Sequence, residues 1–515
     1  MVQASLKKII DWVKKHKWEV ILIVSILLIG SFMRLYRIGE YMTFLGDEGR
    51  DAIVVRRLIV DFDPILVGPG TSIGNMYLGP LYYYFIAPGL LFSGLSPVGP
   101  SVQIAIFGIL TIALVWWTGR EWFGKWAGLS AALLYAIAPT VIIYSRSSWN
   151  PNIMPFLAIL SVYAIWRVYQ HLEYKWLLLI GVSFAFVLQS HYLGLVLAPV
   201  LGTFWFLTLR KADNKKRLLL FTVLCLLIFA FLMSPLLIFD YRHGWRNVEA
   251  LKLFFTERQT TVSARPWSAL PQSWPLLKEF STRLLAGRNE LLGAWVAAGL
   301  LGSILAVATS VKKDYLSNKS FKAFLLLFVW FGFAVLGLGV YKQHIYDHYF
   351  GFFFAAPFLI LGGVIQILVD RAKIRGAWIA LVIMIFLVFY NLADSPLRHS
   401  PNRQLQRTEA VSSLIQQEAG DQPFNFALIA EMNYEAAYQF FFEKWHSKFV
   451  EIDPQRSDET ITSQLFVACE LEDKDKCDPT HNSKAQVANF GWSKIENQWD
   501  VNGVRIYKLS HVIPE

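Results

Sequence analysis

The sequence predicts an all-α polytopic membrane protein that carries a small α/β domain at its C-terminal end. Of its 515 residues, 55% are hydrophobic and only 17% are charged, whereas soluble domains have about 25% charged residues. Apolar runs near the roughly 20 residues that span a bilayer recur as far as residue 393, and the composition turns polar from about residue 395. We therefore expect a membrane domain over 1–394 and an extracytoplasmic α/β domain over 395–515.

About eleven apolar runs are the expected transmembrane helices. They lie at about 18–35, 101–118, 124–145, 152–169, 176–190, 193–209, 217–240, 290–311, 321–340, 349–369 and 377–393. One further run, Leu81 to Phe92, is shorter and contains Pro88-Gly89. That length and those residues favour a juxtamembrane helix on the outer face over a span.

The positions of Lys and Arg predict the orientation in the membrane. If Leu81 to Phe92 does not cross, nearly all basic clusters between spans fall on one side, which the positive-inside rule makes cytoplasmic. The N-terminal segment is then predicted to be a retained signal anchor in the cell membrane. The C-terminal domain is predicted to lie outside the cytoplasm. This pattern explains the net charge of +10 without nucleic acid, because there is no basic arm or stripe interleaved with aromatic residues.

The same topology places the polar loops on the outer side. They include the first outer loop, 40–100, and the long outer loop, 241–289. Within the long loop, Val248 to Phe255 is amphipathic and is expected to lie in the interface as a short helix. Because these loops carry His, Asn, Asp and Tyr, whereas the inner loops are mainly basic, we expect the chemistry on the outer face.

The C-terminal domain shows alternating strand and helix patterns. Expected strands and one helix lie, in order, at Phe424 to Ala430 (strand), Asn433 to Trp445 (helix), Gln464 to Cys469 (strand) and Val504 to Leu509 (strand).

The three cysteines show no metal-binding spacing. Cys469 and Cys477 lie in the C-terminal domain, where an oxidising compartment would permit a disulfide that closes an acidic loop, and two free thiols are the alternative. Cys225 lies within an apolar run and is expected to pack in the core.

The loop from Gly46 to Asp51 is the strongest candidate site. It holds three carboxylates and one guanidinium directly after the first apolar run, and charge at a membrane boundary is costly unless it is solvated or paired. Asp47 and Glu48 are adjacent and point to different sides, so one can act as general base while the other binds a donor, a metal or the backbone. Arg50 offers a planar fork suited to phosphate. The alternative is a helix N-cap at Asp47, with Arg50 paired to a neighbouring carboxylate and no reaction.

Other outer loops supply candidates for a substrate cavity. These residues are Tyr82, Arg146, Asn150, His191 and His348. Each has a structural alternative, because interfacial tyrosines commonly form the aromatic belt and a lone interfacial histidine is commonly a satisfied structural group.

Four motifs in this order resemble the GT-C glycosyltransferases, in the branch that holds protein O-mannosyltransferases and the aminoarabinose transferases of lipid A. The likeness covers about 18–390. The motifs are Asp47-Glu48-Gly49-Arg50, Gly79-Pro80-Leu81-Tyr82-Tyr83-Tyr84, Gly119-Arg120 with Phe123-Gly124, and Ala138-Pro139 with Tyr144-Ser145-Arg146.

The resemblance implies a polyprenyl-phosphate sugar donor and inverting transfer of a single sugar to a glycan, lipid or protein acceptor. It implies that Asp47 takes the proton of the acceptor hydroxyl, and that Arg50 and Tyr349 bind the donor phosphate. This chain has Leu78-Gly79 where the aminoarabinose transferases have an acidic and a basic residue, and Asn150 where many relatives have Asp. A divalent metal is therefore not favoured, and no cofactor is assigned.

Other functions fit the sequence less well. A transporter or flippase of lipid-linked glycans would show charges at the membrane midplane and paired broken helices, neither of which is clear in this sequence. An en bloc transferase similar to the oligosaccharyltransferases would need more carboxylates for a divalent metal. A noncatalytic scaffold is disfavoured by Asp47 and Arg50.

Overall fold

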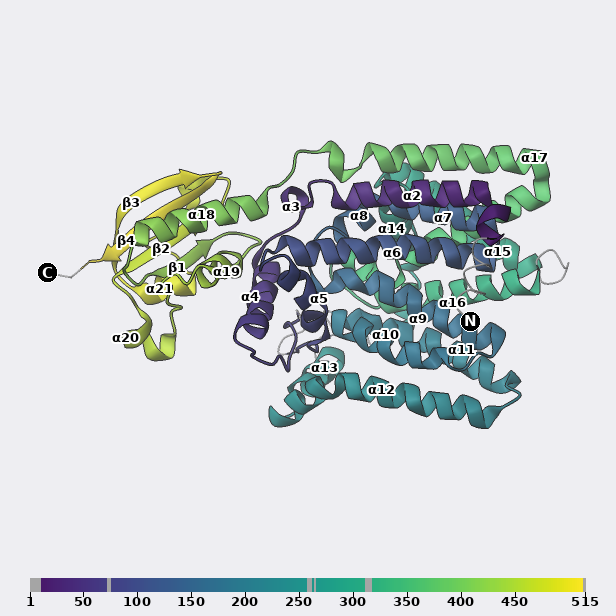
Figure 1. Ribbon diagram of the computed structural model, residues 1–515, viewed down its shortest axis with the longest axis horizontal. Helices are drawn as coiled ribbons and strands as arrows, with labels where there is room; N and C mark the ends of the chain where they lie inside the picture. The colour runs from purple at the N-terminus through teal and green to yellow at the C-terminus, as the bar shows by residue number, and fades with distance from the viewer. Residues whose placement is uncertain (1–10, 72–75, 257–261, 264, 311–316, 513–515) are drawn as a thin grey trace.

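The computed structural model describes residues 11–71, 76–256, 262–263, 265–310 and 317–512. A long bundle of helices forms one end of the molecule and a domain with a small sheet forms the other (Figure 1). The bundle helices are α2 (Lys17–Leu35), α6 (Val98–Trp122), α7 (Lys125–Ile137), α9 (Met154–His171), α10 (Trp176–Ser190), α11 (Leu197–Lys211), α12 (Lys215–Arg242), α15 (Glu290–Ser310), α16 (Asn318–Gly339) and α17 (Ala355–Ala393).

Each predicted apolar run coincides with one of these helices or with one arm of α17. Among the described residues, seven helices are long and apolar enough to cross a membrane, or eight if the bent pair Ser273–Leu285 and Glu290–Ala306 is one span. The predicted count of about eleven also includes the shorter helices α7 and α10 and a second arm of α17. The chain is thus a polytopic membrane protein, as the sequence predicts.

The helix α17 is divided by a sharp break at Lys373, whose φ is 45°. A Cβ atom added at Gly376 would lie 1.8 Å from the carbonyl oxygen of Leu368, so the chain turns back closely there. Val364 before the break and Val382 after it line the same apolar groove. The two arms therefore lie side by side and correspond to the predicted runs 349–369 and 377–393.

The predicted run 124–145 is also divided, by Ala138-Pro139. Ala138 is extended, which proline favours in the residue before it, and a new helix, α8 (Pro139–Tyr144), begins at Pro139. The break leaves carbonyl groups unpaired at the end of α7. The fully buried Arg34 of α2 donates to the carbonyl oxygens of Ala136 at 2.9 Å and Tyr135 at 3.2 Å, and so satisfies them.

Short helices gather between the long ones and toward the sheet domain. Figure 1 shows α3, α4, α5 and α13 at the end of the bundle that faces the sheet, and this group includes both predicted interfacial helices, α5 and α13. The short elements are α3 (Ile38–Tyr41), α4 (Gly46–Val60), α5 (Leu81–Phe92), η1 (Asn150–Ile153), η2 (Tyr192–Val196), α13 (Arg246–Thr256), η3 (Pro266–Ala269), α14 (Ser273–Phe280), η4 (Ser281–Leu285) and η5 (Asp347–Phe353).

The C-terminal domain is a four-stranded sheet covered by helices. The order of its strands is β1-β2-β4-β3, in which β1 and β2 are parallel and β4 is antiparallel to both of its neighbours. Its elements are α18 (Gln404–Ala419), β1 (Asn425–Ile429), α19 (Ala436–Lys444), α20 (Ser457–Thr460), β2 (Gln464–Cys469), α21 (Ala485–Phe490), β3 (Ser493–Val501) and β4 (Val504–His511).

The expected strands and helix of this domain are present, but β3 and the helices α18, α20 and α21 lie outside those expectations. Both β1 and β2 are buried along their whole length, as continuous apolar runs predict for parallel strands that are covered on both faces. The strand β3 is mostly exposed and polar, so it lacks an apolar pattern that would reveal it. Cys469 and Cys477 form a disulfide at the end of β2, and Cys225 is free.

The sheet domain rests on α4. A Cβ atom added at Gly49 would lie 2.4 Å from the Cα atom of Ala437, so the backbones of α4 and α19 are in close contact. Beside this contact, Arg56 and Arg57 donate to the two carboxylate oxygens of Glu443 at 2.9 and 2.8 Å. The helix that begins with the candidate site is therefore the helix on which the second domain sits.

Candidate active site

The helix α4 begins at Gly46, and its first turn carries Asp47 and Glu48. Negative charge is stabilised at this end of a helix, where backbone N–H groups are unpaired. The buried Glu48 reaches back, and its Oε2 accepts from the backbone N–H of Leu45 at 3.0 Å. Because Leu45 is the N-cap residue, Asp47 does not cap the helix, and its side chain faces a cavity.

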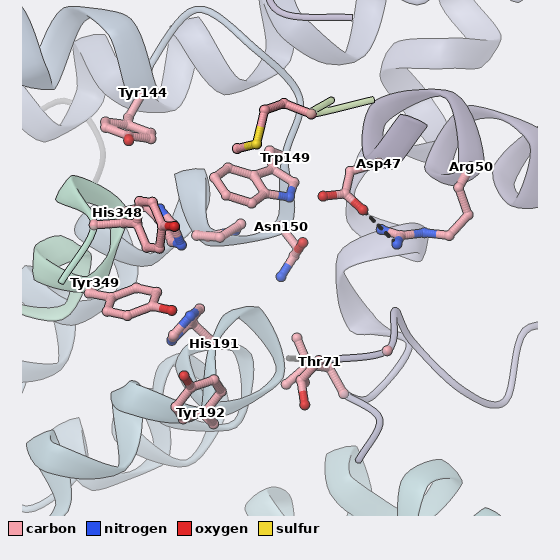
Figure 2. A pocket seen from close by; sticks show the side chains of 15 residues that line it. Asp47, Arg50, Thr71, Tyr144, Trp149, Asn150, His191, Tyr192, His348 and Tyr349 are labelled. Atoms are coloured by element: carbon pink, nitrogen blue, oxygen red, sulfur yellow. Dashed lines mark hydrogen bonds and ion pairs between the residues drawn. The ribbon is translucent and has the colours of Figure 1, made fainter. Parts of the chain in front are cut away.

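Asp47 is held by two donors on one oxygen. Its Oδ1 accepts from Nη1 of Arg50 at 2.8 Å and from the hydroxyl of Tyr434 at 2.8 Å. The side chain is 40% exposed. Figure 2 shows its other oxygen pointing away from Arg50 toward Trp149, across the cavity. That oxygen is placed to accept a proton from a bound molecule.

Arg50 is fixed between two carboxylates. Besides its bond to Asp47, it donates from Nε and Nη2 to Oδ1 of Asp51 at 3.0 and 2.7 Å. Burial raises the pKa of Asp51 to about 6, although the charge of Arg50 opposes the shift. Burial likewise raises the pKa of Glu48 to about 7. The guanidinium is thus oriented at the cavity wall by Asp47 and Asp51.

Six of the predicted site residues line one cavity of about 440 Å³. Figure 2 shows Asp47 and Arg50 on one wall, the two histidines and Tyr349 on the opposite wall, and Asn150 between them. The residues that line it are Asp47, Arg50, Gly70, Thr71, Leu78, Tyr144, Trp149, Asn150, Pro151, His191, Tyr192, Tyr346, His348, Tyr349 and Met432.

The wall opposite Asp47 is aromatic and uncharged. The ring of His348 lies 4.5 Å from that of Trp149, and the ring of His191 lies 5.2 Å from that of Tyr349. Burial lowers the pKa of His348 to about 4 and, together with His348, the pKa of His191 to about 3. Nδ1 of His191 accepts from the backbone N–H of Leu193 at 3.2 Å, so the neutral ring carries its proton on Nε2.

Three predicted site residues do not line this cavity. Glu48 is turned back onto the start of α4, as described above. Tyr82 is buried, with its hydroxyl 2.8 Å from that of Ser148. Arg146 is buried and donates to the carbonyl oxygens of Met33 and Tyr36, both at 2.6 Å. Tyr82 and Arg146 therefore hold the segment between α8 and η1, which presents Trp149 and Asn150 to the cavity.

Sequence reasoning did not select several of the residues that reach the site. Tyr144 is part of the motif Tyr144-Ser145-Arg146 and Trp149 directly precedes Asn150, but nothing local distinguishes either from a packing residue. Met432 and Tyr434 come from the sheet domain, and Tyr434 is 387 positions from the carboxylate it contacts. Within the described ranges, no group of three or more His, Cys, Asp or Glu side chains is arranged to hold a metal ion.

Part of the chain matches a known family. Residues 78–239 match the family model described as "Dolichyl-phosphate-mannose-protein mannosyltransferase". No curated protein matches the chain. These residues include α5 to α11 and most of α12, and so contain the walls of the cavity that carry Asn150 and His191.

Solved structures extend the likeness to nearly the whole chain. ArnT from Cupriavidus metallidurans, solved bound to undecaprenyl phosphate, is similar with a TM-score of 0.57 at 13% identity, covering 95% of this chain and 97% of that one. The archaeal oligosaccharyltransferase AglB from Archaeoglobus fulgidus, in complex with an inhibitory peptide and a dolichol-phosphate, is similar with a TM-score of 0.57 at 15% identity, covering 88% and 70%. The chain therefore has the fold of the GT-C membrane proteins, and these matches agree with the predicted resemblance to the mannosyltransferase and aminoarabinose transferase branch.

Proposed function

We propose that the chain transfers a single sugar from a polyprenyl-phosphate donor to an acceptor hydroxyl, with inversion at the anomeric carbon. The observation that carries this proposal is the meeting of Asp47, Arg50, His191, His348 and Tyr349 around one cavity. A carboxylate faces neutral rings across that space, and a fixed guanidinium stands beside it. These are groups that a base-assisted displacement of a phosphate from an anomeric carbon needs.

The charge of a polyprenyl-phosphate donor matches the polar groups at the site. Both solved relatives hold a polyprenyl phosphate. Such a lipid keeps its chain in the bilayer and its phosphate at the interface, so its enzyme needs cationic and hydroxyl groups at that depth. Arg50 and Tyr349 supply these groups in our proposal, and the neutral His191 adds an N–H donor that carries no competing charge.

The reaction follows from this arrangement. The acceptor hydroxyl gives its proton to Asp47 as its oxygen forms a bond to the anomeric carbon. The bond between that carbon and the phosphate oxygen breaks, and its electron pair leaves with the polyprenyl phosphate. Arg50 stabilises the negative charge that develops there. Because attack and departure occur on opposite faces of the sugar, the product is inverted.

We place the site on the outer face of the cytoplasmic membrane. Figure 1 shows the connection between α11 and α12 at the end of the bundle opposite the sheet domain. That connection carries Arg210, Lys211, Lys215, Lys216 and Arg217, and such clusters favour the cytoplasm. The cavity and the sheet domain then lie outside, where a glycan, a lipid or a protein of the cell envelope is the acceptor.

The test is sugar transfer in proteoliposomes from a panel of polyprenyl-phosphate sugars. Asp47→Asn is expected to lower kcat at least about 100-fold, as loss of a general base does, with unchanged thermal stability. Asp61→Asn is the matched control, because Asp61 is exposed at the other end of the same helix. Equal turnover by wild type and Asp47→Asn would remove Asp47 from the chemistry. Absence of turnover with every donor, combined with movement of a lipid-linked glycan across the membrane, would favour a transporter.

A further inference from the structure

A loop of the C-terminal domain closes over the start of α4. It joins β1 to α19 and carries Met432, Asn433 and Tyr434. Met432 lines the cavity. The hydroxyl of Tyr434 donates to Oδ1 of Asp47 at 2.8 Å and accepts from Nη1 of Arg50 at 3.3 Å. A residue of the second domain therefore bonds to both charged groups at the candidate site.

The fit of this loop on α4 is close. A Cβ atom added at Gly46 would lie 2.3 Å from Cδ1 of Tyr434, so the ring lies directly on the backbone of the first helical residue. Oδ1 of Asn433 accepts from the N–H of Gly46 at 2.9 Å. The loop thus satisfies a backbone donor that a helix start leaves unpaired, and it does so beside the carboxylate.

Asn433 is anchored in turn to the sheet. Its Nδ2 donates to both carboxylate oxygens of Glu470 at 3.2 and 3.1 Å. Glu470 follows β2 directly, accepts from the hydroxyl of Tyr438 and lies 3.7 Å from Arg407. Because this carboxylate has partners on several elements, the side chain of Asn433 has little freedom, and the position of Tyr434 is set by the folded core of the domain.

We propose that Tyr434 is a positioning residue for Asp47, an inference that rests on the proposed function. The hydroxyl holds Oδ1 together with Arg50, which leaves the second oxygen of Asp47 directed into the cavity. With Asp47 40% exposed, its carboxylate would otherwise have room to turn toward solvent. The C-terminal domain is therefore a part of the active site, because it supplies one of the two bonds that aim the base.

The experiment compares Tyr434→Phe with wild type in steady-state transfer across a range of pH. The variant is expected to lower kcat about 10- to 100-fold, the range for loss of a hydrogen bond to a charged group. KM for the donor should change less than about threefold. A hydroxyl that donates to a carboxylate favours its charged form, so the acidic limb of the kcat profile should move to higher pH in the variant. A merely structural role would leave that limb in place.

Tyr507→Phe is the matched control, because it removes a hydroxyl from β4 of the same domain. Its kcat, KM and pH profile should equal those of wild type. A kcat for Tyr434→Phe within twofold of wild type, with an unmoved acidic limb, would overturn the proposal.

A second readout does not depend on turnover. Hydrogen exchange of residues 46–50 should be faster in Tyr434→Phe than in Tyr507→Phe, since the hydroxyl that bonds to Asp47 and Arg50 in the first turns of α4 is lost. If wild type transfers no sugar from any donor, the proposed function fails, and this readout still tests the contact. Equal exchange in the two variants would show that Tyr434 positions nothing.

Discussion

At the scale of single residues, burial separates the roles of four neighbouring charged groups. Asp47 is 40% exposed and faces the cavity, whereas Asp51 is 1% exposed and faces Arg50. Glu48 is buried against the backbone. The types and spacing of these residues predict a functional site, because charge at a membrane boundary is costly unless it is solvated or paired. Spacing alone leaves Asp47 and Glu48 equivalent, and only the direction of α4 relative to the rest of the chain distinguishes them.

The first prediction concerns the fork of Arg50. Arg50→Lys keeps the charge but loses the planar pair of donors that joins Asp47 to Asp51. We expect donor KM to rise at least about tenfold, because the phosphate loses an oriented partner worth roughly 1.5 kcal/mol or more. Arg57→Lys is the control, since Arg57 is on the same helix, is 54% exposed and contacts Glu443. An unchanged donor KM in Arg50→Lys would place the phosphate elsewhere.

The second prediction concerns the pH dependence of stability. Burial raises the pKa of Glu48 from 4.5 to about 7, so the folded state holds this proton more tightly than the unfolded state does. The resulting stability is fully present below pH 4.5 and is lost as pH rises through 7. At about 1.4 kcal/mol for each pH unit, the loss is on the order of 3 kcal/mol.

Glu48→Gln should abolish this dependence while keeping an acceptor for Leu45. Thermal unfolding between pH 4 and pH 8 measures it, and we expect the variant to be the more stable protein at pH 8. Glu409→Gln, at an exposed position of α18, is the control and should follow the wild-type curve. A wild-type Tm that does not fall between pH 5 and pH 8 relative to Glu48→Gln would contradict the burial of a titrating carboxyl.

At the scale of elements, apolar length predicts the helices well and their breaks less well. A run of apolar residues has few stable states in a bilayer other than a helix, so the spans follow from composition. The site residues Asn150, His191, His348 and Tyr349 follow as well, because each is polar or amphipathic at the end of a predicted run. The separation of the two arms of α17 at Lys373 is predicted, but the division of the run 124–145 at Ala138-Pro139 and the strand β3 are not.

The contact between α4 and α19 gives the third prediction. Gly49→Ala would place a Cβ atom 2.4 Å from the Cα atom of Ala437, where only backbone displacement can relieve the clash. We expect a loss of about 1–3 kcal/mol in stability, typical of overpacking, and easier proteolytic release of the sheet domain. Gly202→Ala in α11 is the control, because nothing lies within 4 Å of its added Cβ atom. Equal proteolysis of the two variants would show that this contact does not hold the domain.

At the scale of the whole molecule, two separate folding units share one site. The membrane bundle supplies the cavity walls, and the sheet domain supplies Met432 and Tyr434 at its opening. The sequence analysis separates these units at residue 394 by composition. The contribution of the second unit to the site is not predicted, because contacts between positions several hundred apart leave no local pattern. Met432 and Tyr434 could therefore not be predicted as site residues from the sequence.

The last prediction follows from this sharing. The disulfide between Cys469 and Cys477 flanks Glu470, which holds Asn433 and through it the start of α4. Replacing both cysteines with serine should lower the stability of the sheet domain by about 2–3 kcal/mol, the scale for closing a short loop, and should lower kcat without changing donor binding. The same loss is expected when wild type is treated with a reductant.

Cys225→Ser is the control for this experiment, because Cys225 is a free thiol in α12, remote from Glu470 along the chain. It should keep wild-type turnover with or without reductant. If the double variant lost stability but kept its full kcat, the sheet domain would unfold locally without disturbing Asp47. The hydrogen bonds from Glu470 through Asn433 would then not be needed to position Asp47. The packing of Tyr434 on Gly46 would be sufficient to hold Tyr434 in place.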